Sequence, residues 1–209
     1  MNSAQEYRER LARSPLVAII RGVTPDEVEA IGESILAGGI EIIEVPLNSP
    51  EPLESIRRLA GRLAGRALVG AGTVLDEGQV GEVAKAGGRL IVSPNTNTAV
   101  IRTSAMAGMV SSPGYFTPSE AFAALDAGAH SLKLFPAEGA SPTVLKAQKA
   151  VLPPDVPVLA VGGITPDNMA GWIEAGADGF GLGGGLYKPG QSPEETEAKA
   201  RAYVAGVRR

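Results

Sequence analysis

The sequence has no cysteine, one histidine and few aromatic side chains. Without cysteine the chain can form no disulfide, no thiolate metal site and no cysteine nucleophile. A single histidine leaves little to hold a catalytic divalent ion or to act as the base of a Ser-His-acid triad. We therefore expect no metal and no other cofactor, and a reducing compartment suits the chain.

A strong charge of one sign and long apolar runs are also absent. Nineteen Lys and Arg residues stand against 23 Asp and Glu residues, and no long basic run occurs, so nucleic acid is not an expected partner. The N-terminal segment MNSAQEYRERLARSP is charged and lacks the apolar stretch of a signal peptide, and no apolar run is long enough to cross a membrane. We expect a cytoplasmic protein with no membrane partner.

One internal repeat organises the sequence. An Ala-Gly pair followed by a short apolar run occurs five times. We predict that the glycine of each pair ends a helix in the left-handed conformation and that the apolar run is a buried strand. The pairs begin at Ala37, Ala86, Ala107, Ala127 and Ala175.

The repeat predicts eight strands that alternate with helices in a single domain over residues 1–209. Ser or Thr followed by Pro predicts capped helix starts at Thr24, Ser49, Thr117 and Thr165. Such alternation implies parallel strands, and the closed form is an α/β protein with a (β/α)8 TIM barrel, here with a short N-terminal helix. An open doubly wound sheet is the alternative, although its glycine fingerprint is missing after the first strand. The predicted strands are 16–21, 40–45, 67–71, 90–93, 109–112, 131–135, 158–161 and 179–183.

A lysine lies inside the sixth predicted strand, SLKLFP. Strand alternation places Leu132 and Leu134 on one face and Lys133 on the other, which points into the barrel if the leucines meet the helices. Burial lowers the pKa of a lysine toward neutrality, and a neutral amine can attack a ketone to form a Schiff base. The alternative is a lysine whose head reaches solvent or pairs with a structural carboxylate.

Glu44 has the same placement on the second predicted strand, EIIEV, with Ile43 and Val45 on the opposite face. A carboxylate near a buried lysine can move protons during carbinolamine formation, dehydration and carbon–carbon cleavage. It can equally be the structural partner of Arg21. His130 precedes the sixth strand at the opposite end of the barrel and is predicted to be a surface or loop residue.

Glycines follow the last two predicted strands, in AVGGITPDN and GLGGG. The loops after strands 7 and 8 of such barrels often bind phosphate, and bare backbone allows close approach of amide donors. The alternative is that these glycines only form tight turns. Neither motif contains Lys or Arg, so the backbone would supply most of the binding. Asn48 either belongs to a capped helix start or reaches into the mouth of the site.

Motifs across nearly the whole chain resemble one family, the class I aldolases that cleave 2-keto-3-deoxy-6-phospho-sugar acids. The IRG and PLNSP segments, Val161 before the paired glycines and LYKPGQS are similar to its galactonate branch. The gluconate branch typically has an Arg in a TLRT-like segment where this chain has LNSP, and a Thr before the paired glycines. The motifs that carry the family resemblance are, in order, IIRGVTP, EVPLNSP, VGAGTVL, IVSPN, SPG, LKLFPAE, VGGITPDN and LGGGLY.

The resemblance implies cleavage of 2-dehydro-3-deoxy-6-phospho-D-galactonate to pyruvate and D-glyceraldehyde 3-phosphate, or the same reaction on the gluco epimer or on both. It also implies a cytoplasmic homotrimer. Relatives often have a Ser in the last glycine motif, where this chain reads Gly183-Gly184-Gly185, which removes a possible hydroxyl contact to phosphate. The implied residue roles are Lys133 as the Schiff-base lysine, Glu44 as proton donor and acceptor, Arg21 and Thr73 as ligands of the pyruvate half, the Pro94 carbonyl and Phe135 as pocket walls, and Gly162, Gly163, Gly183 and Gly184 as the phosphate cradle.

Two other classes remain open at this stage. One is a phosphate-binding barrel isomerase or synthase that uses Glu44 and Lys133 as acid and base without a covalent intermediate. The other is a sensor of phospho-sugar acids that keeps the pocket and lacks catalysis. Reductive trapping separates the noncovalent enzyme from an aldolase, because only an imine can be reduced. Lys133→Met separates the sensor from an aldolase, because the substitution abolishes turnover in an aldolase but can spare ligand affinity in a sensor.

Overall fold

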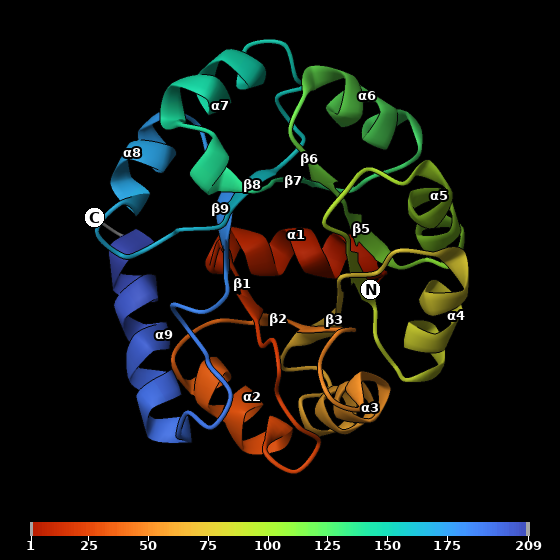
Figure 1. Cartoon of the computed structure of the whole chain (residues 1–209), viewed down its shortest axis with the longest axis vertical. Coiled ribbons are helices and arrows are strands. Elements are labelled where there is room, and N and C mark those ends of the chain that lie inside the picture. Colours follow the sequence, from red (N-terminus) through yellow and green to blue (C-terminus); the bar gives the residue numbers. More distant parts are fainter. Residues whose placement is uncertain (1, 208–209) are drawn as a thin grey trace.

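The computed structural model of the chain describes residues 2–207. Parallel strands form a barrel at the centre, and helices surround it (Figure 1). The strands are β1 (Leu16–Ile19), β2 (Ile42–Pro46), β3 (Leu68–Gly72), β4 (Leu90–Val92), β5 (Val110–Ser112), β6 (Gly114–Tyr115), β7 (Leu132–Leu134), β8 (Val158–Val161) and β9 (Gly179–Leu182). The helices are α1 (Ser3–Arg13), α2 (Val28–Ala37), α3 (Pro52–Arg62), α4 (Glu77–Lys85), α5 (Thr98–Met106), α6 (Pro118–Asp126), the 3-10 turn η1 (Ala137–Gly139), α7 (Pro142–Lys149), α8 (Met169–Glu174) and α9 (Pro193–Val207).

The strand order is β5-β4-β3-β2-β1-β9-β8-β7-β6, and every pair is parallel. The two outer segments of this order, β5 and β6, are joined through Pro113 and together form the fifth strand of the barrel. Gly114 N donates to Ser93 O at 2.9 Å on one side, and Lys133 N donates to Pro113 O at 2.9 Å on the other. The fifth strand therefore closes the sheet. The predicted barrel is confirmed, and the alternative of an open sheet is wrong.

Side-chain alternation along the strands produces two apolar cores. Leu16 and Ala18 pack between β1 and the surrounding helices, whereas Val17 and Ile19 point into the barrel. The same alternation on β2 buries Ile43 against the helices. A barrel interior of this size is filled by side chains, so a polar group placed there loses most of its contact with water.

Glycine ends most of the helices of the repeat as predicted. Gly87, Gly108, Gly128 and Gly176 have φ between 70° and 99°. The prediction for the first Ala-Gly pair is wrong by one residue: Gly38 has a φ of −73°, and the following Gly39 is left-handed at 98°.

Only one of the four predicted Ser/Thr caps is confirmed. Thr117 forms a capping box with Glu120 at the start of α6. The other three helices begin later than predicted, after Glu27, Glu51 and Asn168, and none of these residues makes a side-chain cap. The reason is that the Thr-Pro and Ser-Pro segments form turns and bends between the carboxyl end of a strand and the start of the helix.

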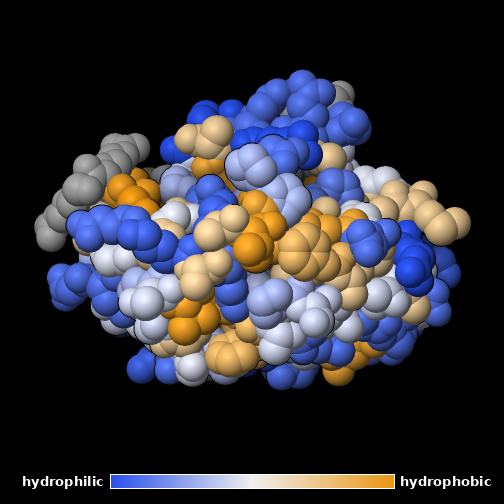
Figure 2. Space-filling model, turned by 90° about the horizontal axis from the view of Figure 1, so that it is seen from above, coloured by the Kyte–Doolittle hydropathy of each residue, from blue (hydrophilic) through white to orange (hydrophobic). Residues whose placement is uncertain are grey.

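The helix α1 lies across one end of the barrel and is separate from the repeat, whereas α9 packs beside α2 and completes the outer ring (Figure 1). The side of the molecule that carries α6 and α7 is mixed, with hydrophobic atoms gathered near its middle among hydrophilic ones (Figure 2). Within residues 2–207 no helix combines the length and the apolar character needed to cross a membrane.

Candidate active site

A pocket of about 470 Å³ opens where the strands end, opposite α1. It collects side chains and backbone from the ends of β1, β7, β8 and β9. The loops after these strands are short, so residues that are far apart in the sequence become neighbours at the rim. The predicted site residues that line this pocket are Arg21, Lys133, Phe135, Gly162, Gly163, Gly183 and Gly184.

Lys133 lies on β7 with its side chain in the barrel and only 7% exposed. Leu132 and Leu134 pack on the helix side of the strand, as the alternation predicts. The Nζ atom lies 4.5 Å from the centroid of the Phe135 ring. Burial lowers the pKa of the Lys133 amine, Glu44 acts in the opposite direction, and the positive charge of Arg21 lowers it further. This environment favours a neutral, nucleophilic amine.

Glu44 lies on β2, is 2% exposed, and lines a small interior cavity together with Lys133. Within the described residues its Oε2 atom has no hydrogen-bond partner. Burial raises the pKa of Glu44 to about 7, although Lys133 and Arg21 act to lower it. A Cβ at Gly72 would collide with the carboxylate, so the glycine leaves the space that Glu44 occupies.

Arg21, at the end of β1, is exposed at the rim of the pocket. Its Nη1 atom donates to the Asn48 Oδ1 atom and, at 3.4 Å, to the Thr73 Oγ1 atom. Thr73 has a left-handed φ of 57°, a strained conformation for a branched residue. These contacts orient Arg21 at the rim and link it to Thr73. Of the two alternatives for Asn48, they favour the one in which it reaches the mouth of the site.

The paired glycines after β8 have positive φ, 113° at Gly162 and 63° at Gly163. Together with Gly183 and Gly184 they present bare backbone to the pocket. Two charged residues, Glu138 and Lys188, also line the pocket on the side of these glycines, and the glycine motifs of the sequence did not reveal them. Lys188 lines the same pocket and adds a cation to the wall where the backbone was expected to supply most of the anion binding.

Glu138 is the second of these charged residues. It lies in η1, directly after LKLFP, and a Cβ at either Gly162 or Gly163 would collide with its side chain. Its carboxylate therefore lies against the two glycines that were predicted to cradle phosphate. Only the tertiary contact between η1 and the loop after β8 shows this, because the two segments are separated by more than 20 residues in sequence.

Thr73, Pro94 and His130 line neither cavity. Pro94 is half-buried and lines neither, and its carbonyl packs against Gly114, where a Cβ would collide with it. Its role as a pocket wall stays a prediction. His130 lies in the loop before β7 and accepts a hydrogen bond at Nδ1 from the backbone N–H of Ser111 at 3.1 Å. It is half-buried, and this burial lowers its pKa.

Within residues 2–207 no group of three or more His, Asp or Glu side chains is placed to hold a metal ion. The arrangement instead combines a buried amine, a buried carboxyl with a pKa near neutrality, and a rim of anion-binding groups. Perturbed groups of this kind that converge in a pocket are typical of catalytic sites. They suit covalent chemistry on a carbonyl compound that carries a distant anionic group.

The comparisons with known proteins agree with this geometry. The family model of KDPG and KHG aldolases matches residues 7–197. A curated 2-dehydro-3-deoxy-6-phosphogalactonate aldolase of Escherichia coli K12 is 48% identical over 93% of this chain and 95% of its own length. A solved structure described as native KDPGal is 48% identical, with a TM-score of 0.91, and the match covers 93% of this chain and 94% of that one.

A designed, cube-shaped protein cage made by fusing symmetric oligomeric domains also contains a similar chain. It is 48% identical with a TM-score of 0.92, and the match covers 94% of this chain and 73% of that one. A family model that spans most of the chain and a relative of nearly equal length confirm the resemblance seen in the sequence: the chain belongs to the KDPG and KHG aldolase family.

Proposed function

We propose that this chain cleaves 2-dehydro-3-deoxy-6-phospho-D-galactonate to pyruvate and D-glyceraldehyde 3-phosphate through a Schiff base on Lys133. The observation that carries the proposal is the pairing of a buried lysine with a buried carboxyl group under a rim of anion-binding groups. Residues 1–209 would act as one catalytic domain.

In the first step the neutral Lys133 amine attacks the C2 carbonyl carbon. The carbinolamine hydroxyl then leaves as water with a proton from the neutral Glu44 carboxyl, which gives a protonated imine and the Glu44 carboxylate. Burial supports this step because it reduces the free energy needed to remove the proton from the amine. The Phe135 ring near Nζ gives the cationic imine a favourable π-face.

In the second step a base removes the proton of the C4 hydroxyl, the C3–C4 bond breaks, and its electrons enter the imine to form an enamine. Glu44 is the proposed base, acting directly or through one water. The same carboxyl then delivers a proton to C3 of the enamine, and hydrolysis of the imine releases pyruvate. A pKa of about 7 lets Glu44 both accept and donate a proton near neutral pH.

The rim holds the two anionic ends of the substrate. Arg21 and Thr73 would bind the carboxylate next to the reacting carbonyl. The glycine loops after β8 and β9 and Lys188 would bind the phosphate. Binding energy at the phosphate, far from the breaking bond, orients the C3–C4 bond over the imine.

Reductive trapping tests the covalent step. Wild type is incubated with pyruvate and cyanoborohydride, and intact mass and peptide mapping locate the adduct. We expect one reduced pyruvyl adduct on Lys133, its absence in Lys133→Met, and its retention in the control Lys85→Met, whose lysine is exposed on α4. If folded wild type gains no adduct at any pH, the Schiff-base step is refuted, and noncovalent acid-base chemistry in the same pocket is favoured instead.

The galacto preference is supported by the 48% identity to the galactonate relative and by Val161 before the paired glycines. Cleavage rates of the two C4 epimers, measured side by side through pyruvate release, test it. A higher kcat/KM for the galacto epimer is expected. A ratio that favours the gluco epimer would assign the chain to the other substrate.

We also propose a homotrimer that works in the cytoplasm. Support for an assembly comes from the similar chain in the cage built of fused symmetric oligomeric domains and from large hydrophobic side chains that stay exposed on the single chain, among them Phe116, Phe122 and Val144. Sedimentation equilibrium tests the assembly, and a mass other than three chains would refute the trimer. The location stays a prediction that fractionation of the source cells would test.

A further inference from the structure

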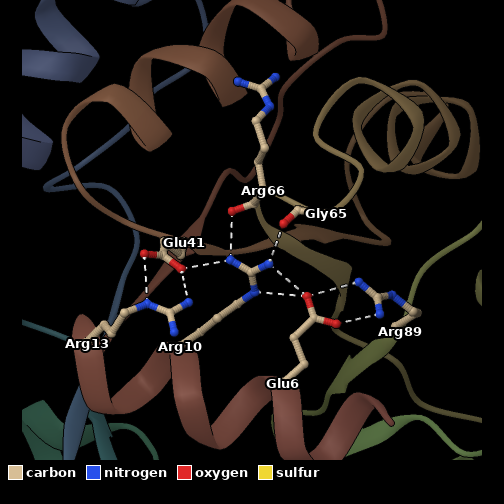
Figure 3. A network of polar contacts seen from close by, with 7 residues as sticks. All are labelled: Glu6, Arg10, Arg13, Glu41, Gly65, Arg66 and Arg89. Carbon is tan, nitrogen blue, oxygen red and sulfur yellow. Dashed lines mark hydrogen bonds and ion pairs between the residues drawn. The ribbon is translucent and has the colours of Figure 1, made fainter. Parts of the chain in front are cut away.

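The helix α1 lies outside the repeated βα units and crosses the end of the barrel opposite the pocket, which we call the barrel floor. A buried arginine anchors it there. Arg10 is 6% exposed and donates hydrogen bonds to Glu6, to Glu41 and to the backbone carbonyls of Gly65 and Arg66, at 2.7 to 3.1 Å. Figure 3 shows this guanidinium between two carboxylates, each of which also contacts a second arginine. Because the charge is fully paired, α1 is held in one position.

The same helix inserts Tyr7 into the barrel. Tyr7 is 1% exposed, and its hydroxyl lies 2.9 Å from the Ser131 Oγ atom, which in turn donates to the Ser112 Oγ atom at 2.9 Å. Ser131 lies directly before β7 and two residues before Lys133, so the two side chains point to the same interior face. Tyr7 thus lies one layer below the reactive lysine.

A cavity of about 10 Å³ separates Tyr7 from the site above it. Tyr7, Glu44 and Lys133 all line it, together with six aliphatic side chains of the barrel interior. Ser112 also lines the cavity, and apart from Tyr7, Ser112, Glu44 and Lys133 the lining is apolar. A cavity of this size has room for at most about one water molecule, so the underside of both reactive groups is shielded from bulk solvent.

We propose that Tyr7 is a positioning residue that α1 presses into the barrel floor to exclude water from beneath Lys133 and Glu44. The inference rests on the proposed Schiff-base function, because it concerns the amine that forms the imine. Tyr7 touches no reacting atom and acts through the solvation of the two groups above it.

The charges around Lys133 show why solvation is the sensitive quantity. Glu44 faces it from β2 and Arg21 from the end of β1, and Glu138 of η1 lines the same pocket. Tyr7 faces the cavity from α1 and is uncharged at neutral pH, since burial raises its pKa to about 12. For Lys133 and Glu44 alike, burial is the largest cause of the pKa shift. Water admitted from below would raise the pKa of the lysine and lower that of the glutamate.

The absence of cysteine from the chain permits a direct test. Tyr7→Cys replaces the phenol with a small side chain and introduces a single thiol at the floor. The rate of pyruvate imine trapping by cyanoborohydride is measured against pH before and after the thiol reacts with benzyl methanethiosulfonate, which restores an aromatic ring there. Tyr7→Phe is the matched control, because it keeps the ring and removes only the hydroxyl.

We expect the midpoint of the pH profile to rise by about 1 pH unit in Tyr7→Cys, to return toward the wild-type value after benzylation, and to stay in place in Tyr7→Phe. Tyr7→Leu fills the floor only partly and should give a smaller rise, so it serves if Tyr7→Cys does not fold. An unchanged midpoint in the folded variants, or an equal rise in Tyr7→Phe, overturns the proposal. Failure of wild type itself to trap pyruvate would instead refute the Schiff-base function.

Discussion

Replacing the buried carboxyl of Glu44 with an amide should abolish catalysis and stabilise the fold at the same time. Glu44 is 2% exposed and its Oε2 atom has no hydrogen-bond partner within the described residues, so its ionised form is poorly solvated in the native state. Glu44→Gln keeps the shape and removes the charge. Activity would fall because no carboxyl is left to accept and return the proton.

The stability change follows from linkage. The pKa of Glu44 rises from its ordinary 4.5 to about 7 on folding, a shift worth roughly 3 kcal/mol at 1.36 kcal/mol per unit. Because the folded pKa is the higher one, the neutral carboxyl stabilises the fold fully below pH 4.5, and this contribution is lost as the pH rises to about 7. Glu44→Gln avoids that loss, so its advantage over wild type should grow to at most about 3 kcal/mol above pH 7 and vanish near pH 4.5.

Urea unfolding at fixed protein concentration, repeated between pH 5 and pH 8.5, measures this difference. Glu82→Gln, on the exposed side of α4, is the matched control and should change stability little at any pH. A Glu44→Gln variant that is no more stable than wild type at pH 8 would refute the reasoning, since it would mean that the native state solvates the charge as well as water does.

Four further substitutions test the rest of the site. Gly72→Ala places a methyl group against the Glu44 carboxylate and should lower kcat by roughly 100-fold with little change in KM, measured by steady-state pyruvate release; an unchanged kcat would contradict the packing argument. Glu138→Gln removes an anion from the proposed phosphate cradle and should tighten competitive inhibition by inorganic phosphate about fivefold. Lys188→Gln removes a cation and should weaken this inhibition by a similar factor. A change of the inhibition constant in the same direction in both variants would exclude an electrostatic cause. Arg21→Met should lower kcat/KM by about 10-fold or more while cyanoborohydride still traps pyruvate on prolonged incubation, and a normal kcat/KM would exclude Arg21 as a carboxylate ligand.

Local patterns in the sequence were sufficient to predict the barrel and the placement of Lys133 and Glu44 in its interior. The Ala-Gly repeat marks helix ends, and the apolar runs between helices mark strands, because both signals depend on backbone conformation and side-chain alternation over a few residues. The inward placement of Lys133 and Glu44 follows from the same alternation. The paired glycines after two neighbouring strands likewise indicated where an anion could approach the backbone.

Other features depend on contacts between segments that are distant in the sequence. The carboxylate of Glu138 against Gly162, the cation of Lys188 at the same wall, and the space that Gly72 leaves for Glu44 all depend on how loops meet across the barrel mouth. The split of the fifth strand at Pro113 was missed because backbone groups on either side of the proline pair with different neighbouring strands. The cap predicted at Ser49 was missed because its Oγ atom accepts a hydrogen bond from the Gly22 N–H of another loop.

The N-terminal helix separates the two kinds of information most clearly. Its sequence alone predicts a short charged helix. Only the tertiary structure brings Arg10 between two carboxylates and places Tyr7 beneath a lysine more than 120 residues away. Periodicity in the sequence determines which side of a helix or strand is apolar. The degree to which Lys133 and Glu44 lose contact with water depends on the groups that cover them from every direction, and only the closed barrel brings these groups together.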